Sequence, residues 1–159
     1  MIWPPDSPWS PWWRTNSKVA RTMVKLSGIT TNDIIYDLGC GDGTLLITAA
    51  RLKGAHGIGV EIDPSRASIA RGRVIFHRLG NKVTIKRKNL FSEDISKATV
   101  VVVYLIPQTL KKLEVKFLKE LKPGTRVISY VYPIDYLPKI AKDDKQHVTV
   151  YEIPKRKSA

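Results

Sequence analysis

The 159 residues of the chain suffice for one domain of ordinary size, and a hydrophobic fraction of 43% argues against a disordered protein. The net charge of +13 favours an acidic partner, which could be a protein, a nucleic acid or an anionic lipid. No apolar run is long enough for a membrane span, no secretory signal is visible, and a single cysteine, Cys40, excludes an intramolecular disulfide. We therefore expect a cytoplasmic protein.

The first residues are rich in tryptophan and proline. Residues 3–13, WPPDSPWSPWW, contain all four tryptophans and four of the ten prolines of the chain. Proline fixes φ and removes an amide donor, so this stretch is predicted to be neither a helix nor a central strand. We therefore divide the chain into a Trp/Pro-rich N-terminal arm, residues 1–15, and one domain, residues 16–159.

Helix and strand patterns alternate along the first half of this domain. A helix is expected over residues 16–28, with Asn16 or Ser17 as its cap and Gly28 as its end. The next elements are a strand, a helix, a strand, a helix that begins at a proline and a third strand, over residues 33–38, 44–53, 56–62, 64–79 and 82–88.

The second half continues this alternation. A fourth strand over residues 98–106 is apolar throughout, as expected for a strand buried on both faces. Apolar residues recur at helical spacing from Leu110 to Leu121, which predicts one helix. Three strands follow, at residues 125–134, 137–141 and 147–153. The pattern predicts an α/β fold: a doubly wound, Rossmann-like, mostly parallel sheet with an antiparallel C-terminal edge, in a single domain.

A glycine-rich loop stands where the first strand meets the following helix. Residues 36–43 read YDLGCGDG, with glycine at every second position from Gly39 to Gly43. Glycines let the backbone turn sharply and let a ligand approach the main chain closely. The acidic side chains of Asp37 and Asp42 would repel a pyrophosphate, so they suit a ligand with a cationic end.

Further polar side chains end the next two strands. Glu61 closes the second strand, where an acid can accept both hydroxyls of a ribose, and Ile62 offers an apolar surface to a purine. Asn89, after the third strand, could read an adenine edge with its amide. Taken singly, Glu61 could equally be a surface acid and Asn89 a turn residue. Their combination with Asp37 at three successive strand ends favours a nucleoside site.

These segments resemble a known family. DLGCGDG, GIGVEIDP and KNLF are similar to motifs I, II and III of the class I, seven-stranded S-adenosylmethionine-dependent methyltransferases. The resemblance implies that Asp37 and the Gly39 backbone hold the methionine end of S-adenosylmethionine, Glu61 the ribose, and Asn89 with Leu90 the adenine. Motif III usually has Asp, and Asn89 keeps the geometry without the charge. The implied cofactor-binding set is Trp13, Thr15, Asp37, Gly39, Cys40, Gly41, Asp42, Gly43, Glu61, Ile62, Asn89, Leu90 and Tyr104.

Longer segments resemble a narrower group within this family. DISKATVVVVYLIPQTL and ELKPGTRVIS are similar to the small archaeal and bacterial protein lysine methyltransferases related to the ATP synthase c-subunit lysine methyltransferase. In the prokaryotic relatives the fifth strand often continues Ser-His-x-Phe, where this chain has residues 129–132, SYVY. The resemblance implies a protein-lysine acceptor. Tyr104, Tyr130 and Tyr132 are the acceptor-side candidates, and aromatic packing is the alternative role for the last two.

Other acceptors stay open from the residues alone. An RNA methyltransferase is suggested by residues 155–157, KRK, and by residues 64–92, which hold eight basic residues and no acid. A small-molecule N-methyltransferase and a binding module with a decayed cofactor site are further alternatives. The fourth strand lacks the Pro-Pro-aromatic signature of enzymes that methylate exocyclic base amines, and Cys40 is expected to pack rather than attack. No catalytic metal is expected, because the three histidines, His56, His77 and His147, are scattered.

The resemblance also leads to a hypothesis about the N-terminal arm. We expect Trp12, Trp13 and Thr15 to close over S-adenosylmethionine, and Trp3 and Trp9 to lie nearer the acceptor or a partner. The alternative is that the arm only fastens to the domain or to a second copy of the chain.

Overall fold

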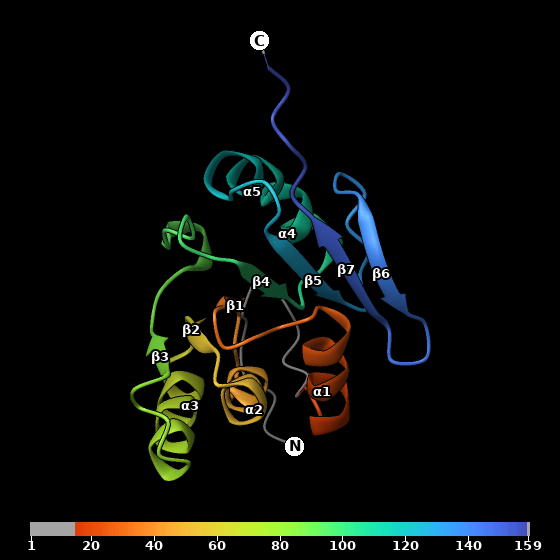
Figure 1. Cartoon of the computed structure of the whole chain (residues 1–159). Coiled ribbons are helices and arrows are strands. Elements are labelled where there is room, and N and C mark those ends of the chain that lie inside the picture. Colours follow the sequence, from red (N-terminus) through yellow and green to blue (C-terminus); the bar gives the residue numbers. More distant parts are fainter. Residues whose placement is uncertain (1–14, 159) are drawn as a thin grey trace.

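The computed structural model describes residues 15–158, which form a seven-stranded sheet with helices on both faces (Figure 1). The strand order is β3-β2-β1-β4-β5-β7-β6. The strands are β1 Ile34–Leu38, β2 His56–Val60, β3 Val83–Lys86, β4 Val100–Val103, β5 Arg126–Tyr130, β6 Lys139–Asp143 and β7 Val148–Glu152. The first five are parallel, β7 runs antiparallel to β5, and β6 pairs antiparallel with β7 at the edge. The predicted fold class is confirmed.

Alternate residues of the central strands face two hydrophobic cores. Val100 and Val102 of β4 pack in one core with α1 Ser17–Leu26, α2 Thr44–Lys53 and α3 Pro64–Phe76. Val101 and Val103 pack in the other with α4 Pro107–Lys112 and α5 Glu114–Glu120. Because both faces of β4 are covered, its four consecutive valines are all buried. None of the helices within residues 15–158 is long and apolar enough to cross a membrane.

Local signals in the sequence set most helix ends. The Asn16 side chain accepts a hydrogen bond from Val19 N at 2.9 Å, which selects Asn16 as the cap of α1. Asp63 caps α3 in the same way through Arg66 N at 2.8 Å, with Pro64 in the first turn. Gly43 precedes α2 in the left-handed conformation that favours glycine.

Three elements differ from the sequence expectation. The single helix predicted between Leu110 and Leu121 is two short helices that meet at Leu113, whose amide is shared between the carbonyls of Thr109 and Leu110. The strand predicted over residues 98–106 is shorter in the structure, where only β4, Val100–Val103, is a strand. The strand predicted over residues 125–134 ends with β5, because the next residue, Val131, has a φ of 69°.

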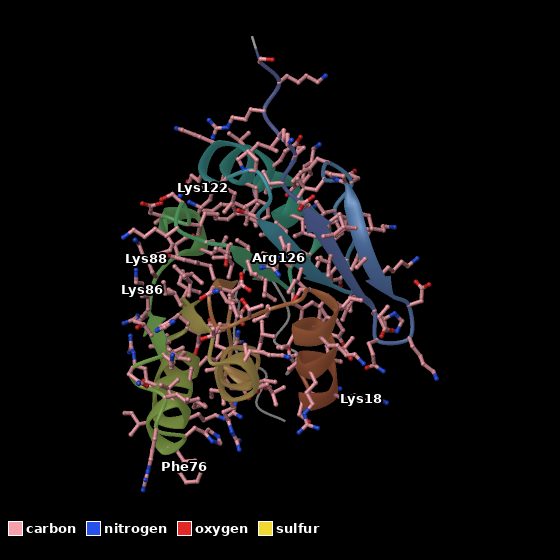
Figure 2. The ribbon with its side chains drawn as sticks, viewed as in Figure 1. Lys18, Phe76, Lys86, Lys88, Lys122 and Arg126 are labelled. Carbon is pink, nitrogen blue, oxygen red and sulfur yellow. The ribbon has the colours of Figure 1, made fainter. Side chains whose placement is uncertain are left out.

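Two ionic clusters surround the buried acids Asp33 and Glu93. Figure 2 labels their cations, Arg126 for the first and Lys86 and Lys88 for the second. Arg126 of β5 donates to the Ser27 carbonyl and to Asp33, and Asp33 also accepts from Thr99 Oγ1 at 2.7 Å. Near the end of β3, Glu93 is paired with Lys86 at 2.6 Å and Lys88 at 3.1 Å. Neither cluster follows from a sequence pattern, because the partners lie on separate segments of the chain.

Candidate functional site

The sheet order reverses between β1 and β4, and the glycine-rich loop follows β1 at this point. Gly39, Gly41 and Gly43 all have positive φ, at 90°, 56° and 79°. The amides of Gly39 and Cys40 both donate to the Val60 carbonyl, at 2.8 and 3.1 Å, so the loop is fastened to the end of β2. The crevice outside the carboxyl ends of the strands is where open α/β sheets bind ligands.

Glu61 ties this loop to the start of α3. Its carboxylate is buried and accepts from Gly41 N and from Asp63 N, each at 3.0 Å. A carboxylate has about four lone-pair sites, so each oxygen can still accept a further hydrogen bond. Glu61 is therefore held in place by the backbone and keeps acceptor capacity for a ligand.

Asp37 is a buried acid at the end of β1. It is 7% exposed, and within residues 15–158 its carboxylate has no hydrogen-bond or ion-pair partner. Burial, followed by the charges of Glu61 and Asp42, raises its pKa from 3.8 to about 7. A buried carboxylate without a counter-charge is costly, and a cationic ligand group would remove that cost.

Asp42 differs from Asp37 because other residues of the chain provide its carboxylate with hydrogen bonds and a counter-charge. Its side chain accepts from Thr44 N at 3.1 Å and from Thr44 Oγ1 at 2.7 Å, and it is paired with Arg73 Nη1 at 3.1 Å. The same Arg73 nitrogen donates to the Asp42 carbonyl and to Thr44 Oγ1, both at 2.9 Å. Asp42 therefore fixes the loop, with Arg73 of α3 as its cation.

Arg73 is a residue that sequence reasoning missed. It falls within the basic stretch of residues 64–92, and its spacing to Asp42 matches no motif. The acid at position 42 and the hydroxyl at position 44 are visible in the sequence, but their cation comes from the next helix.

Cys40 packs between the loop and β2. A Cβ built on Gly59 would stand 2.6 Å from Cys40 Sγ and 2.9 Å from Ile85 Cδ1, so only glycine fits at position 59. Burial raises the pKa of the Cys40 thiol well above its usual value. This environment suits a packing role and not a nucleophile.

The segment after β3 carries the third polar side chain. Asn89 Oδ1 accepts from Phe91 N at 2.9 Å and so caps the short helix η1 Leu90–Ser92. Leu90 is buried, whereas Ile62 after β2 is 40% exposed. The turn thus uses the side-chain carbonyl of Asn89, and hydrogen-bond donors toward a ligand would have to come from its amide group.

Three tyrosines gather at the carboxyl ends of β4 and β5. The ring centroids of Tyr104 and Tyr130 are 4.7 Å apart in an edge-to-face arrangement, and those of Tyr104 and Tyr132 are 6.2 Å apart and stacked. Burial, with smaller contributions from the other two tyrosines, raises the pKa of Tyr104. The three acceptor-side candidates therefore form one cluster.

A strained turn places two of these rings. Val131 has a φ of 69°, and Tyr132 N donates to Tyr130 O at 2.8 Å across it, which is a γ-turn. Positive φ is unfavourable for a β-branched residue. The Val131 amide donates to the His147 carbonyl at 2.8 Å, and Ser129 Oγ donates to the Tyr132 carbonyl, so the surrounding bonds keep the turn closed.

The predictions for the N-terminal arm concern four tryptophans and Thr15. Trp3, Trp9, Trp12 and Trp13 lie outside the described residues. Thr15 is described and half-buried, directly before the Asn16 cap of α1. Within residues 15–158, no group of three His, Cys, Asp or Glu side chains could hold a metal ion.

Comparisons with known proteins identify the family. The family model for the ANTKMT methyltransferase domain matches residues 37–141. A protein-lysine N-methyltransferase of Saccharolobus islandicus is 39% identical over 135 residues, 84% of this chain and 82% of that protein. The ATP synthase c-subunit lysine N-methyltransferase of Homo sapiens is 28% identical over 120 residues, 76% of this chain and 51% of that protein. This chain thus spans about half the length of the human relative.

A solved structure has the same fold over nearly the whole chain. It is the RNA methyltransferase of Salinibacter ruber in complex with S-adenosyl-L-homocysteine, with a TM-score of 0.83 and 35% identity over 92% of this chain and 97% of that one. These matches confirm the resemblance to the class I methyltransferases and to their small lysine-modifying group.

The residues at the site suit S-adenosylmethionine. The buried Asp37 carboxylate, which no described residue pairs, fits the ammonium of the methionine moiety, and Glu61 keeps acceptor capacity for two ribose hydroxyls. Gly39 and Gly41 have positive φ and no side chain, so a ligand can approach the backbone of the loop closely. From these findings together, the chain belongs to the family of the ANTKMT methyltransferase domain and is an S-adenosylmethionine-dependent methyltransferase.

Proposed function

We propose that the chain methylates the side-chain amine of lysine in a protein substrate. The observation that carries the proposal is the tyrosine cluster of Tyr104, Tyr130 and Tyr132 at the carboxyl ends of β4 and β5. The name of the Saccharolobus islandicus relative, a protein-lysine N-methyltransferase, supports this choice of acceptor. A cytoplasmic location belongs to the same proposal and is supported by the single cysteine.

The cofactor residues take the roles that their surroundings favour. In this proposal Asp37 pairs with the ammonium of the methionine moiety, Glu61 accepts from the ribose, and the amide of Asn89 with the Leu90 backbone holds the adenine. The loop from Gly39 to Gly43 supplies close backbone contact, with Asp42 and Cys40 holding its shape. Bound S-adenosylmethionine supplies an electrophilic methyl group.

The acceptor amine must be neutral to attack that methyl group. Free lysine has a pKa of about 10.4, so a lysine side chain is protonated in water at neutral pH. Partly buried aromatic rings disfavour the ammonium by desolvation and can hold a methylated cation through cation–π contact. Tyr104 keeps its own proton at neutral pH, because the ordinary pKa of tyrosine is about 10 and burial raises the pKa of Tyr104 further. Its hydroxyl therefore acts as a hydrogen-bonding group and not as an anionic base. Alignment of amine and methyl group then contributes most of the rate.

RNA is the alternative acceptor, because the Salinibacter ruber neighbour is named an RNA methyltransferase. The basic residues of positions 64–92 give this alternative little further support. Four of the eight bind groups of the domain itself: Arg71 the Ile85 carbonyl, Arg73 the Asp42 carboxylate, and Lys86 and Lys88 the Glu93 carboxylate. That stretch is therefore partly internal structure and not one free basic surface.

The test is transfer of isotopic label from S-adenosylmethionine to a heat-treated cell extract, followed by separate protease and ribonuclease digestion. We expect macromolecular label that only protease removes, with methyl-lysine in the acid hydrolysate. The Glu61→Ala variant, which should lose cofactor binding, is the control for label transferred by other enzymes. Label removed only by ribonuclease would replace the lysine proposal with RNA methylation.

A further inference from the structure

A groove opens beside the tyrosine cluster and is not used by the cofactor residues. It has a volume of about 790 Å³ and lies between α4 and the loop after β5. Its lining includes Gln108, Leu110 and Lys111 from α4, and Ile134, Asp135 and Tyr136 from the loop. Two segments that are far apart in sequence thus form its two walls.

The floor of the groove is apolar and firmly held. Leu110 and Ile134 are buried. The Tyr136 hydroxyl donates to the Leu110 carbonyl at 2.6 Å, and Ile134 N donates to the Tyr151 hydroxyl at 2.9 Å. Both walls are therefore held by hydrogen bonds, which makes the groove a preformed surface of the kind that ligand sites use.

Both walls begin at the tyrosine cluster. Tyr104 precedes the α4 wall, which starts at Pro107, and Tyr132 is directly followed by the loop wall, which starts at Pro133. Since the rings of Tyr104 and Tyr132 are stacked against each other, the groove starts where the acceptor amine is proposed to bind. Because both walls continue in the chain from the cluster, a polypeptide that presents a lysine to the cluster can reach the groove.

We propose that this groove binds the segment of the substrate polypeptide that flanks the acceptor lysine. The inference rests on the proposed lysine function and names what that function recognises beside the lysine. An apolar side chain of the segment lies on the floor of Leu110 and Ile134. The charges around the groove give no preference for an acidic or a basic neighbour, because Lys111 is paired with Glu114 at 3.1 Å and Asp135 lies on the loop wall. Recognition is therefore assigned to the apolar floor.

The experiment compares two acceptors. One is Nα-acetyl-lysine amide, which is too short to enter the groove, and the other is a longer peptide with leucine flanking a central lysine. The variant Gln108→Trp fills the groove at an exposed position of its wall, and Val115→Trp, on an exposed position of α5 outside the groove, is the matched control. Thermal unfolding and calorimetry with S-adenosylmethionine verify that both variants fold and bind the cofactor.

The measured quantity is the ratio of kcat/KM for the long acceptor to kcat/KM for the short one. We expect Gln108→Trp to lower this ratio about tenfold, mainly through KM. The reason is that the indole blocks the position of one anchoring side chain of the peptide. Val115→Trp should leave the ratio unchanged. A ratio unchanged in Gln108→Trp, while lysine is still methylated, would overturn the groove proposal alone. Absence of lysine methylation by the wild-type protein would overturn the proposed function and the groove proposal with it.

Discussion

The carboxylates of Asp37 and Glu61 are both buried at the carboxyl ends of adjacent parallel strands, and they are held in different ways. Glu61 accepts two backbone hydrogen bonds, whereas Asp37 has none from the described residues and its pKa is raised to about 7. Without a bound cation, the buried charge of Asp37 therefore lowers the stability of the folded protein. A cationic ligand group bound there would supply the missing counter-charge, which is the basis of the role proposed for Asp37.

The Asp37→Asn variant should separate stability from binding. The folded-state pKa of Asp37 lies above its unfolded value of 3.8, so the folded protein holds the proton more tightly and stability falls as pH rises from 3.8 through about 7. Above that pH the neutral amide avoids the buried charge, and the cofactor-free variant should be more stable by about 1 to 3 kcal/mol. Chemical denaturation at pH 8 measures this, and a less stable variant would contradict the interpretation. Its activity should fall, because it loses the charge that pairs with the ammonium.

Cofactor binding should therefore be linked to proton release. The ammonium of S-adenosylmethionine favours the ionised Asp37 carboxylate, so the affinity should increase as pH rises toward 7 and a proton should leave near neutral pH. Calorimetric titration in two buffers of different ionisation enthalpy counts the released proton. The Asp37→Asn variant, which has no carboxyl group at this position, should release no such proton. Equal proton release in wild type and Asp37→Asn would assign the titration to another group.

Arg73 should act on the cofactor through the loop that it holds. Replacing it by methionine leaves the buried Asp42 carboxylate without this cation, so the Kd for the cofactor should rise about tenfold, a loss of about 1.4 kcal/mol. The double variant with Asp42→Asn should lose less than the two single variants together, because each removes the same pair. Additive losses in this double-mutant cycle would show that the two residues act separately. Arg78→Met, at an arginine just beyond α3, is the control.

The sequence predicted those parts of the site that depend on residues close together in the chain. The glycines after β1, the acid after β2 and the proline that begins α3 are local signals, and the structure has them at the expected positions. Arg73 and Arg126 could not be assigned in this way. Their partners, Asp42 and Asp33, lie on other segments and become neighbours only after the sheet has formed.

The same distinction explains the boundaries that were wrong. The apolar spacing from Leu110 to Leu121 is truly helical, but spacing does not report where the hydrogen bonds shift, as they do at Leu113. Val131 lies in a sequence typical of a strand, and its tertiary bond to the His147 carbonyl accompanies its positive φ. Local propensity favours a longer strand there, and the surrounding structure overrides it.

The strain at Val131 predicts an unusual response to glycine. Val131→Gly removes a strained conformation worth about 1 to 3 kcal/mol but adds backbone entropy of about 0.5 to 1 kcal/mol, so the net effect should be a stabilisation of about 1 kcal/mol. Little apolar burial is lost, because Val131 is 46% exposed. Turnover should fall several-fold, since the looser turn holds Tyr130 and Tyr132 less firmly against Tyr104. Thermal unfolding and kcat measure the two effects, and a destabilised variant would show that the turn is not strained.

The role of Tyr104 can be divided between its ring and its hydroxyl. Tyr104→Phe keeps both ring contacts and should lower kcat/KM for a lysine peptide about tenfold or less, because the protonated hydroxyl contributes one hydrogen bond. Tyr104→Ala opens the cluster to water, so the amine stays charged, and the loss should be about a hundredfold with the pH optimum moved upward. The pH–rate profiles of both variants measure this, and Tyr36→Phe, a buried tyrosine of β1 outside the cluster, is the control. A profile for Tyr104→Ala with the wild-type optimum would mean that another part of the protein brings the amine to its neutral form.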